Sequence, residues 1–198
     1  MSNRSHQIRA ALAAGPVPTE SLRAGLNVSR PTLARALTAM SGEIVTLGAA
    51  RSTRYALRDS FRGITEMPIY RVDEAGQIKL LGTLYPVRPE GFVMLQTDGM
   101  AAHHEGLPSW LSDMRPQGFL GRAYAHQHAA DLGLPPDVRH WSDTDALRAL
   151  LSSAGDSVGN LVLGDLARDR FINAPNPTVV DCEDYPRHSA QALFIGDT

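Results

Sequence analysis

The sequence predicts an α+β fold built from two units of different composition. Residues 1–60 contain helical patterns followed by a pair of strand patterns, whereas residues 61–198 contain strand patterns, then helical patterns, then one more strand. Separate runs of strands and helices are typical of α+β proteins. The charge divides at the same boundary. Residues 1–60 carry eight arginines and three acidic side chains, a net charge of +5, although the whole chain has a net charge of −2.

Three helices are expected in the first unit. The first has Ile8 and Leu12 on one face and ends at residues 15–16, a Gly-Pro pair, and the second begins near Thr19. Gly25 is expected to make the sharp turn that follows, because glycine adopts backbone angles that other residues resist.

The third helix is expected to begin just after Ser29, a good N-cap residue. Pro31 is tolerated in a first helical turn, where its missing N–H would have no partner. Leu33, Leu37 and Met40 follow at helical spacing and form a stripe that must face inward.

The opposite side of this third helix carries small polar groups and arginines. Ser29, Thr32 and Arg35 are the expected contacts to base edges in a major groove, with Thr38 next to them and Arg30 on the flank, toward the phosphates. The arrangement predicts a helix-turn-helix whose third helix contacts double-stranded DNA.

Two strands are expected next, at residues 43–47 and 53–58. Three helices followed by a β-hairpin predict a winged helix-turn-helix for residues 1–60. The loop of the hairpin would carry Arg51 and Arg54 toward the phosphate backbone, where contacts fix register without reading sequence. A winged unit that packs only against protein is the alternative. The positive charge of this segment favours DNA.

The second unit, residues 61–198, is expected to be a small α+β domain. Its patterns are a hairpin of strands at 68–72 and 78–84, a strand at 92–95, a helix that begins within 115–122 and runs to Gly133, a helix capped by Ser142, and a strand within 158–165.

The composition excludes a membrane protein and favours the cytoplasm. No apolar run approaches the ~20 residues that a membrane helix needs. The first six residues lead straight into the first helix, so no secretory signal is expected. Cys182 is the one cysteine in the chain, which excludes an internal disulfide and fits a reducing compartment.

The second unit also resembles a known family. The resemblance covers roughly residues 61–190, and it is carried by RPQGFLGR at 115–122, WSD at 141–143, GDSVGNL at 155–161 and YPR at 185–187. These motifs resemble the N-terminal region of HipA-family proteins, in the subgroup where a winged helix precedes that region. The resemblance implies a bacterial toxin–antitoxin system, in which full-length members are serine/threonine kinases with a larger catalytic C-terminal body.

The sequence departs from the kinases of that family. It has no glycine-rich loop followed by lysine and no element like the HRD or DFG motifs, so we expect no catalytic residue and no cofactor in this chain. Our main hypothesis is a DNA-binding regulator or antitoxin-like component, non-catalytic by itself, that binds a HipA-like kinase. The alternative is the N-terminal fragment of a longer HipA-like kinase toxin. A homodimer or larger complex is expected on affinity grounds.

Two further chemistries are set aside. Ser157 lies in a G-x-S-x-G pattern, but the expected helix precedes it and the strand follows it, the inverse of a hydrolase nucleophile turn. The histidine pairs 103–104 and 126–128 point to different sides of their elements, and a single cysteine excludes a zinc finger, so no metal site is expected.

Overall fold

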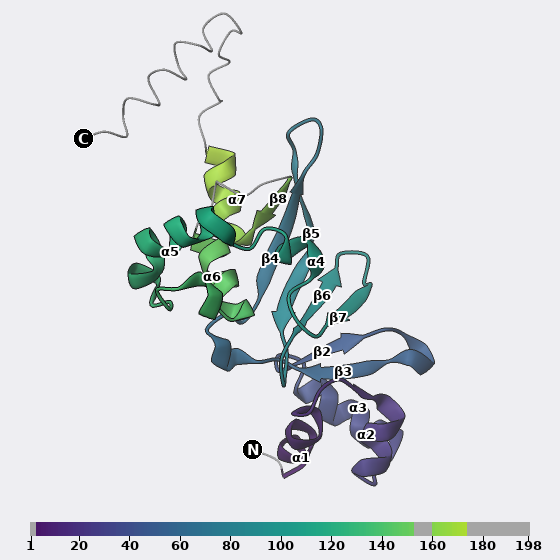
Figure 1. Cartoon of the computed structure of the whole chain (residues 1–198). Helices are drawn as coiled ribbons and strands as arrows, with labels where there is room; N and C mark the ends of the chain where they lie inside the picture. The colour runs from purple at the N-terminus through teal and green to yellow at the C-terminus, as the bar shows by residue number, and fades with distance from the viewer. Residues whose placement is uncertain (1–2, 153–159, 174–198) are drawn as a thin grey trace, which may run out of the picture.

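The computed structural model describes residues 3–152 and 160–173, and Figure 1 shows that they form two stacked parts. The first part combines helices with a small antiparallel sheet of order β1-β3-β2. Its elements are α1 (Asn3–Leu12), β1 (Val17–Pro18), α2 (Thr19–Gly25), α3 (Arg30–Ala39), β2 (Ile44–Leu47), the 3-10 turn η1 (Ala50–Ser52) and β3 (Arg54–Leu57).

The helices of the first part meet in one apolar core, as the sequence predicted. Leu33 and Leu37 of α3 are buried together with Met40, the residue that ends the helix. They pack with Ile8 and Leu12 of α1. The stripe at helical spacing therefore faces inward, and the opposite side of α3 is left toward solvent.

The turn between α2 and α3 differs from the expectation. Gly25 is the last residue of α2 and does not have a positive φ, so the prediction that it makes the turn was wrong. Asn27 takes the left-handed conformation instead, with φ of 49°. Asparagine adopts this conformation more readily than most residues, because its short polar side chain can bond locally.

The second part is an antiparallel sheet of order β7-β6-β5-β4-β8 among the described residues. Its strands are β4 (Met67–Val72), β5 (Ile78–Pro86), β6 (Phe92–Gln96), β7 (Ala101–His104) and β8 (Leu161–Leu163). The other elements are η2 (Ser60–Arg62), α4 (Ser109–Ser112), α5 (Gly118–Leu132), η3 (Val138–His140), α6 (Asp143–Ser152) and α7 (Gly164–Asn173). The α+β class is confirmed. β7, α4 and α7 were not predicted.

The two predicted helices of this part are confirmed with their end signals. Helix α5 ends at Gly133, which is left-handed with φ of 63°. At the start of α6 the Ser142 Oγ accepts from the Asp145 backbone N–H, and the Asp145 carboxylate accepts from the Ser142 backbone N–H. This reciprocal pair is the capping box that the sequence indicated.

Alternation along the strands gives this sheet two buried faces. Phe92 and Met94 of β6 pack with Leu111 of α4 and Leu147 of α6 on one face. Val93, between them, points to the opposite face. Near β4 and β8, helix α7 covers that opposite face through Ala167.

The hairpin β2–β3 covers the rest of that opposite face, and this contact joins the two parts. Val45 and Leu47 of β2 and Ala56 of β3 pack against Val87 and Val93 of the larger sheet. Ile44 and Leu57, on the other side of the hairpin, belong to the helical core of the first part. The hairpin is therefore buried on both faces, although Thr46 remains exposed.

A polar junction reinforces this packing. The Arg62 guanidinium donates to the carbonyls of Val87 (2.9 Å) and Gly91 (3.1 Å) and pairs with Asp59 at 3.1 Å. The Arg148 side chain of α6 donates to the Arg62 carbonyl at 3.0 Å. The linker between the two parts is thus bonded to the β5–β6 loop and to α6.

Some sequence predictions lie outside the described residues. They are the G-x-S-x-G segment at 155–159 with Ser157, and Cys182 and the motif at 185–187. Of the helices that the structure describes, none combines the length and the apolar character that crossing a membrane requires.

Replacing Leu47 by alanine tests the packing of the hairpin. Leu47 is 2% exposed, so Leu47→Ala leaves a cavity between the two sheets and is expected to lower the free energy of unfolding by about 2–5 kcal/mol. Thr46→Ala, at the exposed neighbouring position, is the matched control and should change it by less than about 0.5 kcal/mol. Urea denaturation measures both. Equal effects would contradict a buried hairpin.

Candidate nucleic-acid interface

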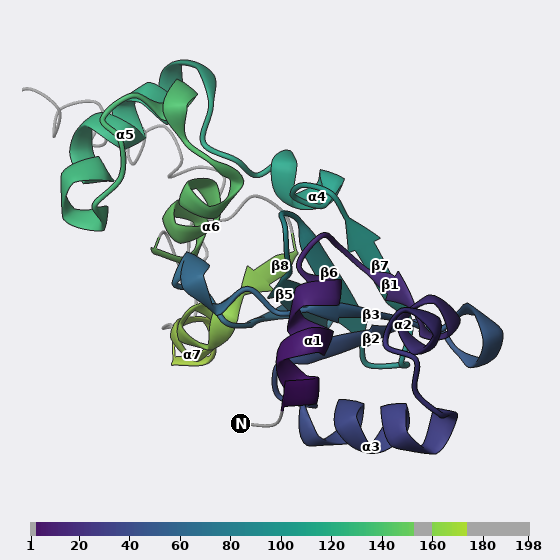
Figure 2. The ribbon, with the colours of Figure 1, turned by 90° about the horizontal axis from the view of Figure 1, so that it is seen from below.

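Helix α3 lies at the outer edge of the first part (Figure 2), with its buried side packed on the β2–β3 hairpin and its other side facing outward. Of the residues predicted to contact DNA from this segment, Thr32 is half-buried, and Ser29, Arg30, Arg35 and Thr38 are exposed. The structure therefore brings these side chains together on one accessible surface. We call this surface, formed by Ser29, Thr32, Arg35 and Thr38, the α3 face.

The N-terminus of α3 is capped differently from the expectation. Ser29 is the N-cap residue by position and has extended backbone angles, but its hydroxyl forms no bond to a helix N–H. The Ser29 and Thr32 hydroxyls lie 2.9 Å apart and bond to each other instead. The Ser29 side chain therefore leaves the backbone N–H groups of Arg30 and Thr32 uncapped, and Pro31 between them has no N–H.

Arg30 is engaged within the protein. Its guanidinium pairs with Glu20 of α2, with 2.5 Å between Nη2 and Oε1 and 3.2 Å between Nε and Oε1. The same carboxylate accepts from Arg23 at 2.8 Å. Hydrogen bonds from Arg23 and then Arg30 lower the pKa of Glu20. A phosphate bound by Arg30 would compete with this carboxylate, a constraint that the sequence analysis missed, although the i, i+3 spacing of Glu20 and Arg23 signals an ion pair.

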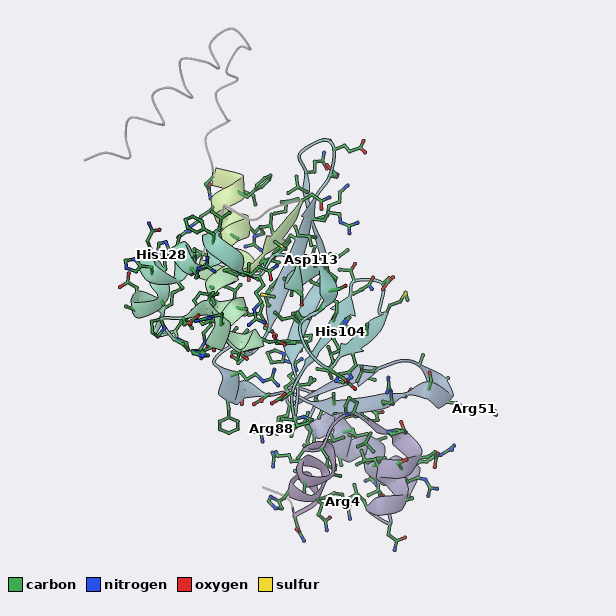
Figure 3. The ribbon with its side chains drawn as sticks, in the orientation of Figure 1. Arg4, Arg51, Arg88, His104, Asp113 and His128 are labelled. Carbon is green, nitrogen blue, oxygen red and sulfur yellow. The ribbon has the colours of Figure 1, made fainter. Side chains whose placement is uncertain are left out.

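Arg51 and Arg54 lie on the loop and strand of the hairpin, where the sequence placed them. Arg51 is exposed at the far end of the hairpin (Figure 3), and Arg54 is the exposed first residue of β3. The loop is closed by bonds from Ser52 Oγ to the Ala49 carbonyl (2.8 Å) and from Thr53 Oγ1 to the Ala50 carbonyl (2.9 Å). This bonding holds Arg51 outward on a short, ordered turn.

His103, on the second sheet, is a neighbour of the hairpin that the sequence did not predict. His103 of β7 lies within the electrostatic reach of Arg54, and burial, followed by the Arg54 charge, lowers the pKa of His103. A hollow of about 430 Å³ between hairpin and β7 is lined by Leu47, Arg51 and Ala101, among others.

The histidines and carboxylates do not cluster as metal ligands. Over residues 3–152 and 160–173, no three histidine, cysteine, aspartate or glutamate side chains are grouped so that they could hold one ion.

These observations define an α+β protein in which a small basic helical part packs against a body that has five strands among the described residues. Residues 64–172, most of the described body, match the model of the family described as the YjjJ-like toxin, middle domain. The chain belongs to this YjjJ-like toxin family.

A curated relative extends the similarity into the first part. The chain is 36% identical over 181 residues to Toxin YjjJ of Escherichia coli (strain K12). That match covers 91% of this chain but 41% of the relative, so the chain spans about two fifths of the length of that toxin. No solved structure matches the chain.

The relatives correct the main functional hypothesis. A DNA-binding regulator or antitoxin-like component was expected, but both the family and the curated relative are named toxins, so that hypothesis was wrong. That hypothesis rested partly on the absence of kinase motifs from the 198 residues. The similarity instead favours the alternative, a toxin of which this chain represents a part.

The Glu20 carboxylate provides a test of the α2–α3 ion pairs. Arg23→Gln removes the main cause of the lowered pKa and should raise the Glu20 pKa toward 4.5, and Arg30→Gln should raise it by a smaller step. Because the folded pKa lies below the unfolded value, these pairs stabilise the fold above about pH 4.5 and lose that effect as the pH falls. Carbon-detected NMR titration measures the shift. Arg139→Gln is the distant control and should leave the Glu20 pKa unchanged. An unchanged Glu20 pKa in Arg23→Gln and Arg30→Gln as well would contradict the geometry.

Proposed function

We propose that this chain is the N-terminal part of a longer toxin, in which a DNA-binding winged helix precedes the middle domain. The observation that carries the proposal is the match of residues 64–172 to a domain described as the middle one of a toxin family. The match to Toxin YjjJ covers 41% of that protein, which supports the same conclusion. The toxic activity then belongs to sequence beyond the residues given.

The element order of residues 3–57 supports a winged helix. Two helices and a short strand lead into α3, and a hairpin closed by the 3-10 turn η1 follows. The short strand β1 pairs with β3 and closes the small sheet beside the helices. With α3 exposed and Arg51 at the far end of the hairpin, helix and loop fit a major groove and the flanking phosphates.

The resemblance to HipA-family proteins supports a serine/threonine kinase as the catalytic body. In that case the body supplies the phosphate-binding loop and the catalytic aspartates, and this chain alone transfers no phosphoryl group. The described part would position that body relative to DNA. Since one small DNA-binding unit rarely binds tightly, a second copy of the toxin on the same duplex would supply the affinity. We place the toxin in the cytoplasm, where Cys182 would remain reduced.

Growth assays test the toxin proposal. Expression of this 198-residue chain in a bacterial host should leave growth unchanged, because the catalytic body is absent. The same chain extended by the reading frame that follows Thr198 in its genome should arrest growth and phosphorylate protein in the presence of ATP. Growth arrest by the short chain, or a stop codon directly after Thr198, would contradict the proposal.

Binding to a duplex tests the winged helix separately. After selection of a preferred duplex, Arg35→Ala should weaken binding by about 1–3 kcal/mol and relax the preference at one base position. Arg51→Ala should weaken binding to all duplex sequences alike. It should also reduce the slope of log binding constant against log salt concentration by about 1. Fluorescence anisotropy at several salt concentrations measures both.

Arg139→Ala is the control for this experiment. Arg139 lies on η3, is paired with Asp137 at 2.6 Å and is 79% exposed. Its loss should leave DNA binding unchanged. Equal binding by wild type, Arg35→Ala and Arg51→Ala would rule out the α3 face and the hairpin loop as the interface.

A further inference from the structure

A cavity of about 630 Å³ lies where the first part meets the junction. Its walls are α1, the end of β3, η2 and the loop between β5 and β6. Its lining includes Arg9, Glu43, Arg58, Phe61 and Arg88. Figure 3 shows Arg88 at the boundary of the two parts. The volume falls within the range of about 300–1,000 Å³ that is typical of small-molecule sites. We call this cavity the junction pocket.

The lining of the junction pocket is cationic. Three arginines, Arg9, Arg58 and Arg88, face a single carboxylate, Glu43. Arg9 and Glu43 satisfy each other with two hydrogen bonds of 2.6 and 2.8 Å. The charge of this pair is balanced, and Arg58 and Arg88 are the other two arginines of the lining.

Each of these two arginines has a carboxylate nearby but no hydrogen bond to it. Arg58 lies 3.7 Å from Glu66, and Arg88 lies 3.7 Å from Asp59, distances that are too long for hydrogen bonds. Within residues 3–152 and 160–173, the buried Nε of Arg58 has no hydrogen-bond partner. That atom has almost no accessible surface, so a ligand in the cavity would meet the terminal Nη atoms of the two arginines, whose positive charge suits an anion.

Aromatic rings hold both guanidinium groups in place. Arg58 lies over the Tyr85 ring at 4.1 Å, and Arg88 lies over the Phe61 ring at 5.0 Å. Phe61 is 85% exposed, so nothing in the described chain covers the rest of its ring. An exposed phenylalanine beside two arginines suits a ligand with a planar ring and a phosphate, because bases stack on aromatic faces and phosphates bond to guanidinium forks.

We propose that the junction pocket binds a nucleoside phosphate, with the phosphates at Arg58 and Arg88 and the base against Phe61. The Ser60 and Thr65 hydroxyls, which also line the pocket, can bond to the sugar. The site is separate from the α3 face and does not depend on DNA binding. Its walls come from both parts of the chain, so a bound nucleotide stabilises their packing.

Isothermal titration calorimetry of the 198-residue chain with ADP, adenosine and inorganic phosphate tests the proposal. ADP should bind in the micromolar range and raise the melting temperature. Arg88→Gln should weaken ADP and phosphate binding by about tenfold or more. Phe61→Ala should weaken ADP by about tenfold and leave phosphate unchanged, because only the base stacks on the ring.

Two matched controls separate the site from general effects. Phe119→Ala removes another exposed phenylalanine, on α5, and Arg139→Gln removes another exposed guanidinium. Both should bind ADP like the wild type. Phe61 is a surface residue, so Phe61→Ala keeps the test valid even where Arg88→Gln affects folding.

Three outcomes would overturn the proposal. The first is no heat with ADP at millimolar concentration. The second is ADP binding that neither Arg88→Gln nor Phe61→Ala weakens, which would place the nucleotide elsewhere. The third is ADP and phosphate binding of equal strength that Phe61→Ala leaves unchanged, which would reduce the site to a phosphate site.

Discussion

The burial of both faces of the β2–β3 hairpin is the constraint on which the rest of the structure depends. Ile44 and Leu57 complete the helical core, and Val45 and Leu47 complete the core between the sheets. A hairpin fixed on both sides cannot rotate without opening one core. The α3 face and Arg51 therefore keep one orientation relative to the larger sheet, whatever follows that sheet in the chain.

Local patterns predicted the parts of the fold that local interactions determine. The spacing of Leu33 and Leu37 gave α3, and Ser142 with Asp145 gave the start of α6, because both signals lie within two helical turns. The second buried face of the hairpin was not predictable in this way. Val45 looks like any apolar strand residue, and its partner Val93 lies far away in sequence. Long-range packing of this kind leaves no periodic signal.

The candidate site shows the same division. Exposure of Arg35 and Thr38 followed from the helical pattern, since they lie opposite the buried leucines. The pairing of Arg30 with Glu20 did not, because it depends on how α2 and α3 cross. Asn27 in place of Gly25 at the turn is a similar case, since composition alone favours glycine there. The junction pocket combines α1, η2 and the β5–β6 loop, so no single stretch of sequence indicated it.

A network of polar contacts joins the junction pocket to the linker between the two parts and to helix α6. Arg62 is bonded to the loop that leads into β6, and its carbonyl accepts from Arg148 on α6. Asp59, which pairs with Arg62, also lies 3.7 Å from Arg88 in the junction pocket. A ligand that draws Arg88 toward itself changes the charge around Asp59, and Asp59 and Arg62 form the connection between the hairpin and the sheet. Both cores share that hairpin, so the junction lies beside the contact that joins the two parts.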